Sequence, residues 1–135
     1  TLSLDGQTDI SHDIAIVVIG EDPYTEMKGD SDSLFLSDKD KQTIANIQAQ
    51  NVPYVIVLIT GRPLIVTQEI NESDAFVVAW LPGSEGNGVS DVLFGDVSPT
   101  GKLSFSWPKS MDNVPVNIGD IDYDPLYKLG YGLTY

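Results

Sequence analysis

The chain has 135 residues, 41% of them apolar, which is enough to build the core of one domain or of a large part of one. Its 20 acidic and 7 basic residues give a formal net charge of −13. This balance argues against nucleic-acid binding, which needs clustered lysines and arginines, and against attraction to an anionic membrane. The sequence contains no cysteine, so it forms neither disulfides nor thiolate metal sites.

No apolar run approaches the roughly 18 residues of a membrane span, so we expect no membrane insertion. The opening residues Thr1–Leu4 contain no initiator methionine and do not form a signal peptide. We therefore expect the numbering to begin inside a longer protein.

Three apolar runs rich in β-branched residues predict buried strands over residues 14–19, 52–59 and 75–80. Between the first two runs, Ser37 has the chemistry of a helix N-cap, and Ile44 and Ile47 give a helical stripe that reaches about Gln50. A second helix is predicted over residues 88–94.

Two short segments complete the pattern. Residues 64–66 are apolar and fit either a strand or the entry to a helix, and the sequence leaves this open. Residues 103–107 alternate apolar and polar side chains, which predicts an edge or antiparallel strand. Continuous apolar strands that alternate with helices indicate the α/β class. We expect a three-layer α/β sandwich with a mainly parallel sheet and one antiparallel edge strand.

The loop over residues 20–30 follows the first predicted strand and holds four acidic residues, one tyrosine and one lysine. Open α/β sheets place their ligand sites at such strand ends, although a charged loop is also typical of plain solvated surface. A carboxyl group that acts as a general acid needs a raised pKa, from burial or from nearby negative charge. For Glu26 the neighbouring acidic residues Glu21, Asp22 and Asp30 supply such charge, whereas an adjacent Lys28 would oppose it.

Arg62 is the only arginine of the chain and follows the second predicted strand. Because the carboxyl ends of parallel strands meet at one edge of a sheet, Arg62 is expected near the acidic loop. A guanidinium group at a strand end often binds a carboxylate through two hydrogen bonds. We therefore expect Arg62 to brace Glu21, Asp22 or Asp30 rather than to touch a substrate.

Other polar groups give weaker signals. The glycines within residues 81–88 do not have the spacing of a phosphate-binding loop, so we interpret them as a tight connection that allows close backbone packing. His12 is the only histidine and has no partner for a nucleophilic triad. Asp120, Asp122 and Asp124 hint at cation binding but lack the glycine and glutamate of an EF-hand loop, so metal content stays open.

Seven stretches of this sequence resemble the second domain of family 3 glycoside hydrolases, the exo-acting β-glucosidases and β-glucan glucohydrolases. The matching stretches are residues 20–30, 61–63, 79–86, 91–96, 99–103, 123–127 and 130–134. They occur in the family's order and cover the chain from about residue 14 to its end. The acidic loop is most similar to that of the glucan exohydrolase branch.

The resemblance implies that residues 1–135 are the C-terminal portion of the second domain of a two-domain enzyme that hydrolyses β-glucan oligosaccharides with retention of configuration. The N-terminal barrel domain, a partner outside this chain, would carry the nucleophilic aspartate. Glu26 would be the acid/base. The residues that would support it are Glu21, Tyr24, Lys28, Asp30 and Arg62. The resemblance implies no cofactor and an extracellular or periplasmic location, and we expect the isolated chain to be inactive.

Two alternatives from other classes stay open. A non-catalytic carbohydrate-binding module also suits neutral sugars and an acidic surface, and it would bind glucan as an isolated domain. A flavodoxin-like or nucleotide-binding domain is compatible on grounds of fold alone, and it would be stabilised by flavin or nucleotide.

Overall fold

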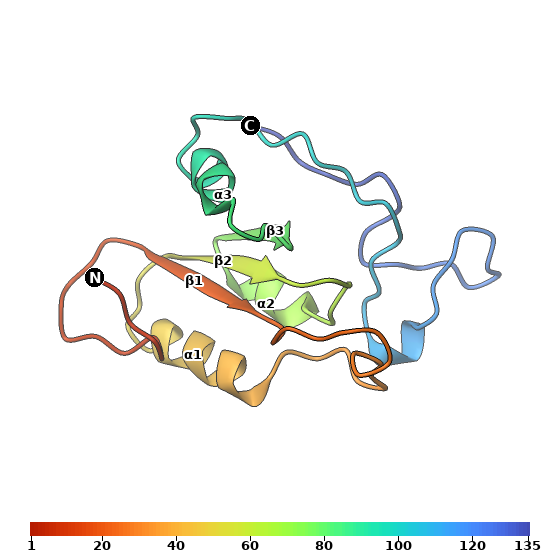
Figure 1. Ribbon diagram of the computed structural model, residues 1–135, viewed down its shortest axis with the longest axis horizontal. Coiled ribbons are helices and arrows are strands. Elements are labelled where there is room, and N and C mark those ends of the chain that lie inside the picture. The colour runs from red at the N-terminus through yellow and green to blue at the C-terminus, as the bar shows by residue number, and fades with distance from the viewer. The chain divides into compact units, whose positions relative to one another are not determined.

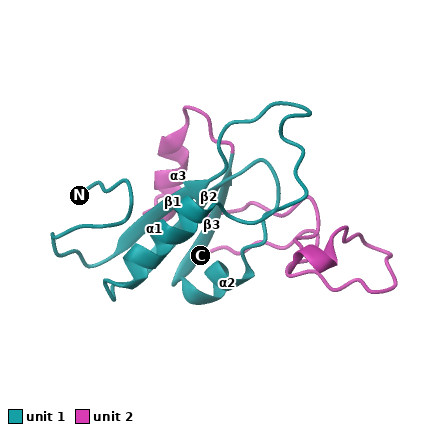
Figure 2. Cartoon of the chain, turned by 90° about the horizontal axis from the view of Figure 1, so that it is seen from below, with its two compact units in different colours: residues 1–80 teal, residues 81–135 magenta.

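The computed structural model describes all residues, 1–135 (Figure 1). The chain divides into two compact units, residues 1–80 and residues 81–135, which are drawn in different colours in Figure 2. Each unit is described by itself. None of the helices combines the length and the apolar character that crossing a membrane requires.

Unit 1 is built on a parallel sheet of three strands in the order β1-β2-β3. The strands are β1 (Ala15–Gly20), β2 (Tyr54–Ile59) and β3 (Ala75–Trp80), so all three predicted strands are confirmed. The central strand is the most deeply buried of the three, because Ile56, Val57 and Leu58 are almost completely buried. The α/β class and the parallel sheet are therefore confirmed.

Two helices connect the strands of unit 1. Helix α1 (Asp38–Gln48) begins at Ser37, whose side chain accepts a hydrogen bond from the backbone N–H of Asp40, as the sequence predicted. Helix α2 (Thr67–Glu72) follows residues 64–66, which form the entry to this helix, with Ile65 making an isolated bridge to Phe35. Both helices lie on the same side of the sheet (Figures 1 and 2), as right-handed crossovers between neighbouring parallel strands require.

The two faces of β1 differ in burial. Val17 and Ile19 are buried on the face that packs against α1, together with Ile44 and Ile47 of the helix. Val18, on the opposite face, is 63% exposed. Helices therefore cover one face of this strand within unit 1.

Unit 2 contains helix α3 (Gly86–Leu93) and the short 3-10 helix η1 (Met111–Asn113). The structure does not show the antiparallel edge strand that was predicted for residues 103–107. The backbone N–H groups of Leu103 and Trp107 donate instead to the carbonyls of Tyr131 and Tyr127, within unit 2. Alternation of side chains indicates an extended segment but not its partner, and here the partner is the C-terminal segment of the chain.

Candidate functional site

The acidic loop leaves the carboxyl edge of the sheet where β1 and β2 lie very close together. Gly20 ends β1 and pairs with Ile59, the last residue of β2. A Cβ atom on Gly20 would lie 1.9 Å from the carbonyl oxygen of Ile59, so only glycine fits at this position. The close approach places Glu21 beside the end of β2, and the backbone N–H of Glu21 donates to Ile59 (3.1 Å).

Arg62 binds Glu21 with two of its nitrogen atoms. Its Nε and Nη2 atoms both lie 2.7 Å from Glu21 Oε1. The second carboxylate oxygen, Oε2, accepts from the Thr60 hydroxyl at 2.7 Å and from the Tyr24 hydroxyl at 3.3 Å. The expected bracing of an acid by Arg62 is therefore confirmed, with Glu21 as the partner.

This network sets the ionisation of Glu21. Partial burial acts to raise the pKa of Glu21, but the hydrogen bonds and charge of Arg62 and the hydroxyls of Thr60 and Tyr24 outweigh it, so that the pKa is lowered. Hydrogen bonding to Glu21 raises the pKa of Arg62 despite some desolvation. Glu21 is thus a firmly ionised carboxylate whose oxygens are both occupied.

Arg62 also holds the far side of the loop. Its Nη1 atom donates to the carbonyl of Gly29 (2.6 Å), and its guanidinium lies 4.5 Å from the centre of the Tyr24 ring. A Cβ atom on Gly29 would lie 2.2 Å from Tyr24 Cδ2, so the ring packs directly against this glycine. One arginine therefore contacts the loop before and after Glu26.

Glu26 lies in a turn that is closed by backbone hydrogen bonds. Gly29 N–H donates to Thr25 (2.8 Å), and Lys28 N–H donates to Glu26 (2.8 Å) around Met27, which has a φ of 67°. A positive φ at a non-glycine residue in such a γ-turn is strained and needs support from its surroundings. The Glu26 side chain is exposed and makes no hydrogen bond or ion pair within the chain.

Of the acids expected to supply negative charge near Glu26, Glu21 is paired with Arg62 and therefore carries no free charge. The side chains of Lys28 and Asp30 are exposed and make no hydrogen bond, so neither residue is part of the network. Asp30 acts on Arg62 only through its charge, which helps to raise the pKa of the guanidinium.

Two members of the network were missed by the sequence analysis. Thr60 was not singled out, because the burial and the hydrogen bond of its hydroxyl become apparent only in the fold. Gly29 was not singled out either, because its packing against Tyr24 depends on a contact that no local sequence pattern encodes.

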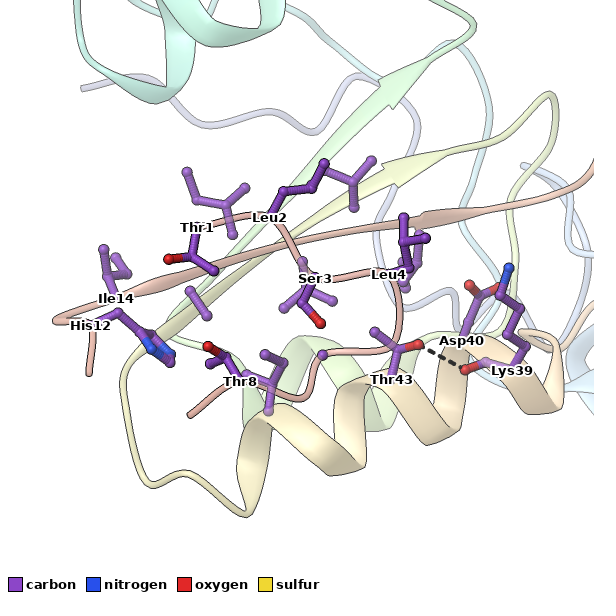
Figure 3. A pocket seen from close by; sticks show the side chains of 17 residues that line it. Thr1, Leu2, Ser3, Leu4, Thr8, His12, Ile14, Lys39, Asp40 and Thr43 are labelled. Atoms are coloured by element: carbon purple, nitrogen blue, oxygen red, sulfur yellow. Dashed lines mark hydrogen bonds between the residues drawn. The ribbon is translucent and has the colours of Figure 1, made fainter. Parts of the chain in front are cut away.

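The cavities of the chain are lined by residues outside the acidic loop. A cavity of about 410 Å³ in unit 1 lies beside the free edge of β1, where Thr1–Leu4 passes along the strand (Figure 3). Its polar lining includes His12 and Thr43, and the Thr43 hydroxyl is already bonded to the Lys39 carbonyl. No residue of the acidic loop lines it, so the candidate site is an exposed loop rather than a pocket of this chain.

The aspartates and the glycine-rich connection that the sequence analysis considered do not form a metal site or a tightly packed loop in the structure. No group of three or more His, Asp or Glu side chains is arranged to hold a metal ion. Asp124 pairs with Lys109 (2.6 Å), and Asp120 accepts from the backbone of Asn117. Gly86 and Gly88 have no atom within 4 Å of an added Cβ, so the close packing predicted for the glycine-rich connection is wrong.

Comparisons with known proteins agree on one family. Residues 5–135 match the model of the glycosyl hydrolase family 3 C-terminal domain. The chain is 34% identical over 91% of its length to a periplasmic beta-glucosidase of Salmonella typhimurium, of which it covers 19%.

Solved structures give the same picture. The structure of an exo-1,3/1,4-beta-glucanase from a Pseudoalteromonas species superposes with a TM-score of 0.89 and 52% identity over 99% of this chain and 18% of that one. A beta-glucosidase from Listeria innocua, solved with gluconolactone, gives a TM-score of 0.80 and 31% identity over 91% of this chain and 20% of that one. The chain thus spans about a fifth of the length of these relatives. The match over nearly all of its residues shows that the chain belongs to glycosyl hydrolase family 3, as part of the C-terminal domain.

Proposed function

We propose that this chain is the part of a retaining β-glucosidase or β-glucan exohydrolase that supplies the general acid/base, Glu26. The observation that carries the proposal is the free Glu26 carboxylate on a turn whose backbone is fixed at the carboxyl edge of the sheet. Membership of family 3 and the names of the three relatives described above, two β-glucosidases and a β-glucanase, support the reaction class.

The choice between the two glutamates of the loop follows from their partners. A general acid must carry a proton and release it to the leaving group. Glu21 is held ionised by Arg62 and has no free oxygen, so it is a poor proton donor. Glu26 has no competing partner within the chain and is free to approach a substrate.

In the proposed reaction, Glu26 protonates the glycosidic oxygen while an aspartate of the barrel domain attacks the anomeric carbon. The bond to the leaving group breaks, and a glycosyl-enzyme ester forms. Deprotonated Glu26 then takes a proton from water, whose oxygen attacks the ester and releases glucose with retained configuration. The two carboxyl groups are expected about 5–5.5 Å apart.

The proposal makes the barrel domain an obligatory partner. Because the exposed Glu26 needs a sugar and an attacking carboxylate opposite it, we expect no hydrolysis by the isolated chain. The substrate class is a β-glucan oligosaccharide, and the reaction needs no cofactor. The proposal includes a location outside the cytoplasm. The Salmonella typhimurium relative, a periplasmic beta-glucosidase, supports this location.

The test is Glu26→Gln in the intact protein, which keeps the shape of the side chain and removes its acidity. The variant should hydrolyse substrates with poor leaving groups about 10²–10⁴-fold more slowly, the range that general acid catalysis contributes. The first step with activated aryl glucosides should be much less affected, because their leaving groups need little protonation. Steady-state and single-turnover rates on both substrate types measure this difference.

Asp32→Asn is the matched control, because Asp32 is an exposed carboxylate just after the loop and makes no hydrogen bond. It should keep wild-type rates on both substrates. Equal rates of Glu26→Gln and wild type on poor leaving groups would refute the assignment.

A further inference from the structure

The guanidinium group of Arg62 reaches three separate points of the acidic loop. It pairs with Glu21 at the start of the loop (2.7 Å), lies over the Tyr24 ring (4.5 Å to its centre) and donates to the Gly29 carbonyl (2.6 Å). All three of its nitrogen atoms are used, so its orientation is fixed. Glu26 lies in sequence between these anchor points.

We propose that Arg62 is a positioning residue for proton transfer, because it fixes both ends of the turn that carries Glu26. This inference rests on the proposed role of Glu26 as acid/base. Arg62 touches neither the reacting atoms nor Glu26, and it acts through the backbone of residues 24–29. The side chain that delivers the proton and the side chain that sets its place are thus different residues.

The turn needs such an external anchor. Its own hydrogen bonds run between Gly29 and Thr25 and between Lys28 and Glu26, and they close around Met27 in a left-handed conformation. Strained backbone of this kind persists only where the surrounding structure holds it. Met27 is 82% exposed and so contributes little packing, and the contacts to Tyr24 and Gly29 supply the support instead.

Arg62 is itself held in place by a rigid base. Thr60 is buried at the end of β2, its hydroxyl lies 2.7 Å from Glu21, and its backbone N–H donates to Trp80 at the end of β3. Through Glu21 and Thr60, the guanidinium is therefore connected to the ends of two strands of the sheet, β2 and β3. A shift of the reacting group by about 1 Å is enough to cost roughly 10²-fold in rate, so this fixed reference matters for Glu26.

The experiment uses the intact protein and compares Arg62→Met with Arg62→Lys, each in the wild-type and in the Glu26→Gln background. Arg62→Met should lower kcat on poor leaving groups by about 10- to 100-fold with little change in KM, because Glu26 remains but is displaced. Arg62→Lys keeps the charge but not the fork, so it should recover part of the loss. In the Glu26→Gln background, Arg62→Met should cause no further loss, since both changes act on one step.

A second readout is independent of activity. The backbone amides of Lys28, Gly29 and Asp30 donate within the turn, and their hydrogen exchange should become faster in Arg62→Met while the amides of α1 keep their protection. Lys41→Met is the matched control, because it removes a cation that also lies over an aromatic ring, Phe35, outside the network. It should change neither the exchange of the turn nor kcat.

The outcomes separate the two proposals. If Glu26→Gln has its expected effect but Arg62→Met adds its full effect to it, or leaves exchange in the turn unchanged, the positioning role is wrong and the acid/base assignment stands. If Glu26→Gln has no effect on poor leaving groups, the proposed function fails and the positioning role fails with it. If Arg62→Met does not fold, the same criteria apply to Arg62→Lys.

Discussion

Two segments, residues 20–30 and residues 81–88, follow β1 and β3 at the carboxyl ends of these parallel strands, and each contains at least two glycines and a glutamate. The first is tied to the end of β2 by Arg62, Thr60 and a close backbone approach at Gly20. In the second, the Ser84 hydroxyl donates to its neighbour Glu85, and added Cβ atoms at the glycines would meet nothing. Composition therefore does not tell which loop can hold a reactive group in place, whereas anchoring by a charged hydrogen-bond network does.

The largest expected difference between the two segments comes from adding one methyl group to a glycine of each. Gly20→Ala should lower the free energy of unfolding by about 3 kcal/mol or more, because the new Cβ meets the backbone carbonyl of Ile59, which cannot move aside. Gly88→Ala, in α3, should instead raise it by about 0.5–1 kcal/mol, since the site is open and alanine favours a helix.

Urea unfolding of the two variants and the wild-type chain measures both changes. Similar effects of the two substitutions would contradict the distinction between the loops, because it assigns close packing to one glycine and open space to the other.

A smaller effect is expected from the charge of Glu21. Its folded pKa is lowered, so its contribution to stability is fully present above the ordinary glutamate value of 4.5 and is lost as the pH falls through the folded value. Glu21→Gln should lower the free energy of unfolding by about 1–2 kcal/mol at neutral pH and remove this acid-dependent part.

The measurement is the pH dependence of unfolding, from pH 7 downward, for wild type and Glu21→Gln. The difference between the two proteins should shrink as the pH falls. A difference that stays constant down to acidic pH would show that Glu21 stabilises the loop by something other than its ionised carboxylate.

Much of unit 1 could be predicted because its signals are local. Continuous apolar runs mark the three strands, and Ser37 with two buried isoleucines marks α1. Helix α2 was left open as one of two alternatives after residues 64–66, since it has only six residues and its N-cap residue Val66 offers no capping side chain. Segment 103–107 shows the other limit: it pairs antiparallel with the C-terminal segment instead of forming an edge strand of the sheet, and a pattern of alternation does not identify the pairing partner.

Part of the candidate site, the ion pair, could be predicted from the sequence, and part could not. A single arginine at a strand end and an acidic loop at the neighbouring strand end indicated an ion pair, and Glu21 is the acid that forms it. The contact of Gly29 with Tyr24 and the hydroxyl of Thr60 depend on tertiary distances, so no spacing in the sequence indicates them.

The most direct test of the central claim, that Glu26 is the acid/base, is rescue by azide. In Glu26→Ala of the intact protein, with an activated aryl β-glucoside as substrate, azide should accelerate turnover by at least about tenfold, because an anion attacks the glycosyl-enzyme without needing a general base. The product should be β-glucosyl azide, since the barrel nucleophile still gives net retention. Turnover that does not respond to azide and yields only glucose would contradict the claim.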